Sequence, residues 1–143
     1  MTLPEPKQTE LGSNSDTLAF LKGRVVLVEK GIVENIVNQG EHLETEDIKE
    51  FIQLSNALSK GNKHCILVTS GHLTTISKEA MRASAKLNES DGKLAMALMV
   101  EFVGQRLIGN FYLAIMKPKM KTKLFTNREK ALEWLRSIRD SNI

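Results

Sequence analysis

Two short and almost wholly apolar runs, residues 64–69 and 94–100, constrain the fold of this chain more than any other feature. A strand with one face in water alternates polar and apolar residues, whereas a strand of a parallel sheet is covered on both faces and is apolar throughout. Segments in which apolar residues recur at helical spacing flank each run. Because strands that alternate with helices pair in parallel through right-handed crossovers, the sequence predicts a mostly parallel sheet.

Three further segments have the pattern of strands. Residues 25–29 and 32–37 are rich in β-branched residues, and Gly31 between them can adopt the positive φ of a tight hairpin turn. Residues 119–125 form the last run. The expected order is β-β-α-β-α-β-α-β-α, which is an α/β arrangement with a mixed, mostly parallel five-stranded sheet, an opening β-hairpin and four helices.

The expected helices have recognisable starts and buried faces. Thr45 is the expected N-cap of the first helix and Ser77 that of the second. Residues 102–116 form the third helix, which a proline ends two residues later. Thr126, followed three residues later by a glutamate, is expected to open the last helix with a capping box, and the spacing places Trp134 on the buried face of that helix.

The length and composition of the chain suit a single folded unit. Its 143 residues fall in the range of one domain, and its 41% hydrophobic and 26% charged residues are typical of globular proteins. Residues 1–20 are polar and contain proline, serine and glycine, so we expect a flexible N-terminal lead-in. Residues 21–143 are then expected to form one domain.

The net charge of +3 conceals an uneven distribution. Residues 1–60 contain six Lys or Arg and ten Asp or Glu, a balance of −4, whereas residues 61–143 contain fourteen and seven, a balance of +7. Such a separation can steer a partner or favour head-to-tail self-association. Ordinary solvated faces of a helix and a strand are the alternative.

Several classes of function are disfavoured by what the sequence lacks. A single cysteine, Cys65, cannot form an internal disulfide framework or a cysteine zinc site. The most apolar segment, 102–116, is interrupted by polar residues and is shorter than the ~20 residues of a membrane-spanning helix. Without a signal peptide in the sequence we expect a cytoplasmic protein with no transmembrane segment. Phosphate-binding, dinucleotide-binding and hydrolase motifs are missing, so we expect no enzymatic activity, no cofactor and no metal site.

A set of local sequences carries a family resemblance. They are ISKEA at 76–80, RLIGNF at 106–111, Pro118, Thr122, LF at 124–125, AL at 131–132 and WL at 134–135. Over residues 24–138 the chain resembles the STAS domain of anti-anti-sigma factors, and more closely the small bacterial STAS/SEC14 domain proteins of unknown function. The resemblance implies a STAS-like fold and a regulatory or protein-interaction module.

The resemblance also gives Ser77 a second interpretation besides that of a helix cap. In anti-anti-sigma factors a serine at the start of the second helix is phosphorylated by a partner kinase, which switches binding on or off. Ser77 occupies the comparable place in this sequence, although no glycine follows it closely as in those factors. A phosphate there would meet free backbone N–H groups at the helix N-terminus, with Lys78 adjacent.

One loop and one helix are the candidate ligand or partner surface. Gly71, His72 and Thr74 follow a central strand, and open α/β sheets bind ligands beyond the carboxyl ends of their strands. The 102–116 helix, which includes Phe111 and Tyr112, is apolar on more than one face. One face can cover the sheet, and the other needs a homodimer contact, a partner or burial by the terminal helix.

Lysines recur at every second position near the last strand. We interpret them as protection of a sheet edge against aggregation, with an anionic membrane surface as the alternative. We expect no nucleic-acid binding, because the stripe lacks neighbouring exposed aromatic residues for base stacking. The four residues are Lys117, Lys119, Lys121 and Lys123.

Two hypotheses about function follow. The first is a non-enzymatic module of STAS-like type that binds another protein or itself as a homodimer, with phosphorylation at Ser77 as a control. The second is a small-molecule or lipid-binding domain with a pocket between helix 102–116 and the sheet.

Overall fold

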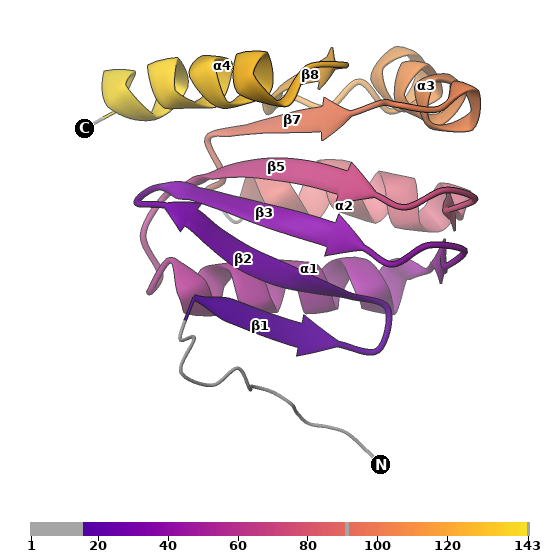
Figure 1. Cartoon of the computed structure of the whole chain (residues 1–143), viewed down its shortest axis with the longest axis horizontal. Coiled ribbons are helices and arrows are strands. Elements are labelled where there is room, and N and C mark those ends of the chain that lie inside the picture. Colours follow the sequence, from indigo (N-terminus) through magenta and orange to yellow (C-terminus); the bar gives the residue numbers. More distant parts are fainter. Residues whose placement is uncertain (1–15, 91, 143) are drawn as a thin grey trace.

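A six-stranded sheet forms the centre of the computed structural model, which describes residues 16–90 and 92–142 (Figure 1). The strand order is β1-β2-β3-β5-β7-β8, antiparallel among the first three strands and parallel from β3 to β8. A separate two-stranded sheet pairs β4 (His42–Leu43) with β6 (Thr75–Ile76). The strands of the large sheet are β1 (Thr17–Phe20), β2 (Gly23–Glu29), β3 (Ile32–Val37), β5 (Cys65–Ser70), β7 (Ala95–Met99) and β8 (Lys121–Phe125).

The helices cover both faces of the sheet. α4 lies on one face, and α1 and α2 lie on the other (Figure 1). The elements are α1 (Thr45–Leu58), α2 (Lys78–Ser90), α3 (Val103–Phe111), the π-helical turn η2 (Tyr112–Met116) and α4 (Arg128–Ser141). The α/β class, the four helices and the mostly parallel sheet are therefore confirmed.

The sheet has one strand more than we predicted. β1 (Thr17–Phe20) lies within the segment that we expected to be a flexible lead-in, whereas residues 1–15 of that segment lie outside the described residues. β1 pairs with β2 along the edge of the sheet, and the Phe20 ring meets the Phe51 ring of α1 edge-on at 4.8 Å. The alternation of Leu18 and Phe20 with less apolar residues is the sequence signal for this strand.

Two of the expected caps are displaced by one residue. α1 is capped by Glu44 instead of Thr45, and the Asp47 carboxylate accepts a hydrogen bond from the Glu44 N–H at 2.8 Å. α4 is capped by Asn127 instead of Thr126, because the Asn127 side-chain oxygen accepts from the N–H three residues later at 2.9 Å. In both cases the residue next to the threonine occupies the N-cap position; asparagine is a preferred cap at α4, and at α1 the Asp47 carboxylate reaches back to the N-cap N–H as in a capping box.

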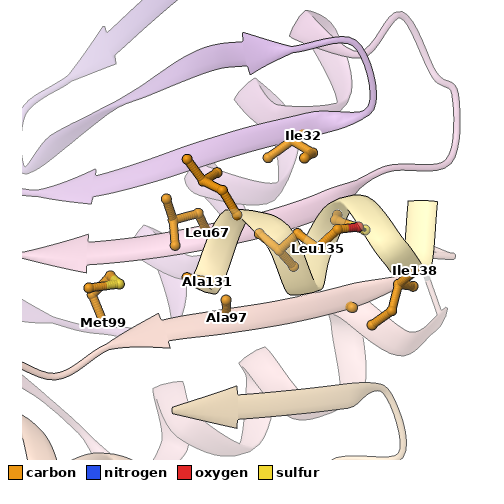
Figure 2. Close-up of a cluster of buried hydrophobic side chains, with 10 residues drawn as sticks. Ile32, Leu67, Ala97, Met99, Ala131, Leu135 and Ile138 are labelled. Carbon is orange, nitrogen blue, oxygen red and sulfur yellow. Dashed lines mark hydrogen bonds between the residues drawn. The ribbon is translucent and has the colours of Figure 1, made fainter. Parts of the chain in front are cut away.

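Small residues let α4 lie close to the sheet. Ala97 of β7 and Ala131 of α4 are fully buried where the two elements meet. Figure 2 shows Leu135 and Ile138 of α4 in the same cluster, which also contains Leu67 of β5. This face of the sheet is therefore closely packed by a single helix.

Trp134 extends that packing to the edge of the sheet. Its ring is partly buried and lies 5.5 Å from the Phe125 ring of β8. We expect Trp134→Ala to lower the free energy of unfolding by about 2–3 kcal/mol, because a partly buried aromatic side chain loses less than one in the core. Trp134→Phe, which keeps a ring there, should recover more than half of that loss. Urea denaturation of the variants tests this, and a Trp134→Ala variant as stable as the wild type would contradict the packing of α4.

The α4 face also contains an ion-pair cluster around Glu29. The carboxylate accepts hydrogen bonds from Arg136 at 3.0 Å and from Arg139 at 2.6 Å. These bonds, first from Arg136 and then from Arg139, lower the pKa of Glu29 below its ordinary value. A lowered pKa means that the stabilisation is present above the ordinary pKa and is lost as the pH falls through the folded-state pKa.

Glu29→Gln tests this linkage. We expect the variant to be less stable than the wild type at neutral pH, and the difference to shrink as the pH falls through the lowered folded-state pKa of Glu29, below which the wild-type carboxyl is itself protonated. Glu133→Gln, at an exposed position of α4, is the matched control and should show no such dependence. Free energies of unfolding from urea titrations at several pH values give the measurement, and a gap that persists at low pH would contradict the assignment.

Candidate functional site

Gln105 holds the start of α3 against the end of β5. Its Oε1 accepts hydrogen bonds from the N–H groups of Glu101 and Phe102, at 2.7 and 3.1 Å, and its Nε2 donates to the Ser70 carbonyl at 2.8 Å. The helix therefore begins at the carboxyl end of the parallel strands, where open α/β sheets place ligands. Our sequence analysis did not single out Gln105, although a glutamine three residues after the start of an apolar helix was a usable signal.

Large exposed apolar side chains gather on α3, η2 and the loop before β6. Among the described residues seven large hydrophobic side chains are exposed, and only Leu21 of these lies elsewhere. Val103, Leu107 and Ile115 recur every four or eight residues and are 76%, 66% and 59% exposed. We call this surface the apolar patch; it consists of Leu73, Phe102, Val103, Leu107, Phe111 and Ile115.

The predicted loop residues lie beside this patch. The exposed His72 ring packs on the Phe102 ring at 4.6 Å, which joins the loop to the start of α3. Gly71 approaches Gln39 so closely that a Cβ would lie 2.6 Å from the Gln39 Cα. Thr74 donates its hydroxyl hydrogen to the Gly71 carbonyl at 2.7 Å and so closes the turn.

The two adjacent aromatic residues of the predicted surface lie in different environments. Phe111 is exposed and belongs to the apolar patch, whereas Tyr112 is buried. Burial raises the pKa of Tyr112 above its ordinary value, and a hydrogen bond with Ser84 of α2, at 3.4 Å, opposes that rise. Only Phe111 is therefore available to a partner at the outer surface.

A glycine in α3 explains how close this helix comes to the sheet. A Cβ on Gly109 would lie 2.9 Å from a methyl group of Leu124 in β8, so a larger residue would require the Leu124 side chain or the helix to shift. A Cβ on Gly104, in the first turn of the same helix, would have no such neighbour within 4 Å, so the close packing involves Gly109 and not Gly104.

A cavity of about 150 Å³ lies behind α3, bounded by the sheet, α1 and α2. α2 contributes Met81, Ser84 and Asn88, which the spacing of three and four residues places on one face of the helix. Tyr112 contributes from η2 and Asn35 from β3. The lining is mostly apolar, with a few amides and hydroxyls distributed around it.

Ser77 caps α2, as the sequence predicted. Its Oγ accepts a hydrogen bond from the Ala80 N–H at 3.0 Å, and its own N–H donates to the Leu43 carbonyl at 3.0 Å. The hydroxyl is half-buried, and the neighbouring Lys78 is exposed. Ser77 therefore satisfies one of the free N–H groups of the helix start.

Removal of this cap gives a direct test of its structural role. We expect Ser77→Ala to destabilise the fold by about 1 kcal/mol, because the Ala80 N–H loses its acceptor, and Ser77→Asn to retain most of the stability. Thermal and urea unfolding of the two variants provide the comparison. Equal stability of Ser77→Ala and the wild type would show that the cap contributes nothing.

The lysines near the last strand do not form one stripe of four. β8 is an edge strand, as expected, and Lys121 and Lys123 are exposed on it. Lys117 instead adopts a left-handed backbone conformation with φ of 46° at the end of η2, and Lys119 precedes the strand. The period-two prediction is wrong for Lys117 and Lys119, because the strand begins two residues later than expected.

Two classes of site were sought among the described residues. In residues 16–90 and 92–142 no group of three or more His, Cys, Asp or Glu is placed to hold a metal ion. Within the same part of the chain, no helix combines the length and the apolar character needed to cross a membrane.

Comparisons with known proteins place the chain in a family. A family model described as "Domain of unknown function (DUF7793)" matches residues 26–139, and the chain belongs to that family. A comparison with curated proteins finds no match. Among solved structures the chain is similar to an uncharacterised protein of the DUF3478 family with a SpoIIAA-like fold from Shewanella loihica PV-4, with 18% identity over 73% of this chain and 82% of the other and a TM-score of 0.47. The expectation of a member of a family of unknown function fits the family model.

Proposed function

We propose that this chain is a non-enzymatic, STAS-like regulatory module that acts by binding another protein through the apolar patch. The observation that carries the proposal is the gathering of six of the seven large exposed apolar side chains on α3, η2 and the adjoining loop. Single exposed apolar residues are common on protein surfaces, but a contiguous set marks a site of interaction.

The charged residues around the patch indicate what kind of partner surface it can bind. Arg106 and Lys117 are exposed next to members of the patch, and residues 61–143 have a net charge of +7. An interface of this kind has an apolar centre and a charged rim that steers the approach of the partner. The proposed partner therefore has an apolar contact surface with acidic residues around it, and a second copy of this chain is the competing occupant.

Ser77 is the proposed point of control. A phosphate on its hydroxyl would add negative charge at the N-terminus of α2, next to Lys78 and four residues after Leu73 of the patch. The helix N-terminus would stabilise that charge, so α2 would stay folded while the surface near the patch changed sign. Phosphorylation would thus alter the affinity for a partner with an acidic rim.

A photo-crosslinking amino acid at position 107 tests the binding surface. We expect it to capture a specific protein in the cells that produce the chain, and the substitutions Val103→Glu and Leu107→Glu together to lower the affinity for that protein by about tenfold or more. Both side chains are exposed, so the fold should tolerate the change.

Position 21 supplies the matched control. Leu21 is 86% exposed and lies outside the patch, so a crosslinker or a glutamate there should affect neither capture nor affinity. Light scattering measures self-association in parallel, and a dimer that Val103→Glu and Leu107→Glu dissociate would identify the partner as a second copy. Equal capture from positions 21 and 107, or an affinity unchanged by the double substitution, would refute the proposed surface.

A further inference from the structure

We propose that the cavity between the sheet and helices α1, α2 and α3 is a binding site for an uncharged, apolar molecule or chain end of about six or seven carbon atoms. This site is separate from the apolar patch. Its floor contains Val68 of β5 and Leu98 of β7, which pair with each other across the sheet. Each of these strands has a neighbouring strand on both sides, yet both side chains remain partly exposed. Their uncovered surface therefore faces the cavity.

A partly exposed floor departs from the rule that parallel strands are covered on both faces. Two residues earlier on the same strands, Ile66 and Met96 form an equivalent pair and are only 1% and 3% exposed. Because side chains alternate along a strand, this pair lies on the same face of the sheet as Val68 and Leu98. The cover of this face is thus complete over the first pair and incomplete over the second, and an apolar molecule in the cavity would complete it.

The cavity lies toward the carboxyl ends of the parallel strands, where open α/β sheets bind ligands. β3, β5 and β7 all end on the side of the molecule where α3 lies (Figure 1). At that end the cavity is lined by Ser70, the last residue of β5, and by Thr74 and Thr75, and Thr75 is exposed to solvent. The apolar part of a ligand would therefore lie over the floor, and a hydroxyl end group would lie near these hydroxyl side chains and water.

The size and lining of the cavity restrict the ligand. A volume of about 150 Å³ equals that of a cavity known to hold benzene, whereas drug-sized molecules occupy about 300–1,000 Å³. None of the described residues that line the cavity is charged, and an ionised group inside it would lose its hydration without a partner. Met81, Met96 and Met99 are in the lining, and these unbranched side chains adapt to the shape of an apolar guest.

Ser84 shows that the sequence leaves this space open. It lines the cavity from α2, at a helix position where leucine or methionine would usually fill a core. Its hydroxyl is already paired within the protein, since it accepts hydrogen bonds from Asn88 at 3.2 Å and from Tyr112 at 3.4 Å. The small side chain therefore leaves room in the cavity, and the interior that remains is suited to hydrocarbon.

Titration of the wild-type protein with linear alcohols from 1-butanol to 1-nonanol, followed by two-dimensional NMR, tests the proposal. We expect saturable shifts of the backbone signals around the cavity, with a dissociation constant on the order of 1 mM for 1-hexanol. Each buried methylene group should strengthen binding about fourfold, so the affinity should rise to about 1-heptanol and then level off, because further carbons lie outside the cavity. A rise that continues to 1-nonanol, or no saturable shift with 1-hexanol up to about 10 mM, would overturn the proposal.

Substitutions that fill the cavity from two sides locate the site. Ser84→Met on α2 and Val68→Phe on the floor should each abolish the binding of 1-hexanol, whereas Ser137→Met, at an exposed position of α4, should leave it unchanged. Val103→Glu together with Leu107→Glu should also leave it unchanged, so failure of the proposed partner surface and failure of the cavity are measured separately. Binding that survives both filling substitutions, or that is lost when the patch carries the two glutamates, would refute the site.

A measurement on the wild-type protein makes the test independent of how the variants fold. Nuclear Overhauser effects between 1-hexanol and the methyl groups of Val68 and Leu98 are expected, because these side chains form the floor of the cavity. Effects confined to Val103 and Leu107 would show that the alcohol binds only to the outer surface and would overturn the proposal.

Discussion

The parallel pairing of β3, β5 and β7 is the constraint on which the rest of the structure depends. Strands in this position need cover on both faces, because neither face carries enough polar side chains to meet water. Ile66 and Leu67 of β5 point to opposite faces and are both fully buried. Each helix in residues 16–90 and 92–142 covers part of one of the two faces.

The two covers are built differently. α4 alone covers one face, where alanines allow close approach and where the Arg128 guanidinium pairs at 2.8 and 2.9 Å with the buried Glu34 carboxylate. A third bond from the Thr69 hydroxyl, at 2.9 Å, leaves that buried charge well satisfied. On the other face α1, α2 and α3 together cover the sheet, and the cavity lies between these helices and the sheet. The same sheet thus has one closely packed face and one face with room for a ligand.

Much of this fold could be predicted from the sequence, because its strongest signals are local. The apolar runs, the glycine of the hairpin and the hydroxyl of Ser77 each specify structure within a few residues. We did not predict β1, because a segment of four residues with two large apolar side chains is too short to be distinguished from a polar lead-in. Its pairing with β2 becomes visible only in the structure. The displaced caps have a similar origin, since neighbouring Glu, Thr and Asn side chains compete for the same N–H groups.

The candidate sites were harder to predict, because they depend on contacts between distant segments. The sequence indicated an apolar surface and a loop at the right end of the sheet, yet it gave no reason to separate Phe111 from Tyr112. Adjacent residues of a helix point about 100° apart, and the packing against α2, where Tyr112 hydrogen-bonds with Ser84, determines which of the two is buried. Val68 and Leu98 are 30 residues apart (98 − 68), and no sequence pattern shows that the cover over this pair is incomplete.

α3 connects the two proposed sites through its opposite faces. Gln105, Ile108 and Gly109 line the cavity, while Val103 and Leu107 belong to the apolar patch. A displacement of α3 would therefore change both the lining of the cavity and the proposed partner surface. Such coupling is reciprocal. If a bound ligand changed the affinity of the protein for the partner by some factor, the bound partner would change the affinity of the protein for the ligand by the same factor. Coupling between the cavity and the patch would therefore require α3 to have two arrangements that bind the partner with different affinity.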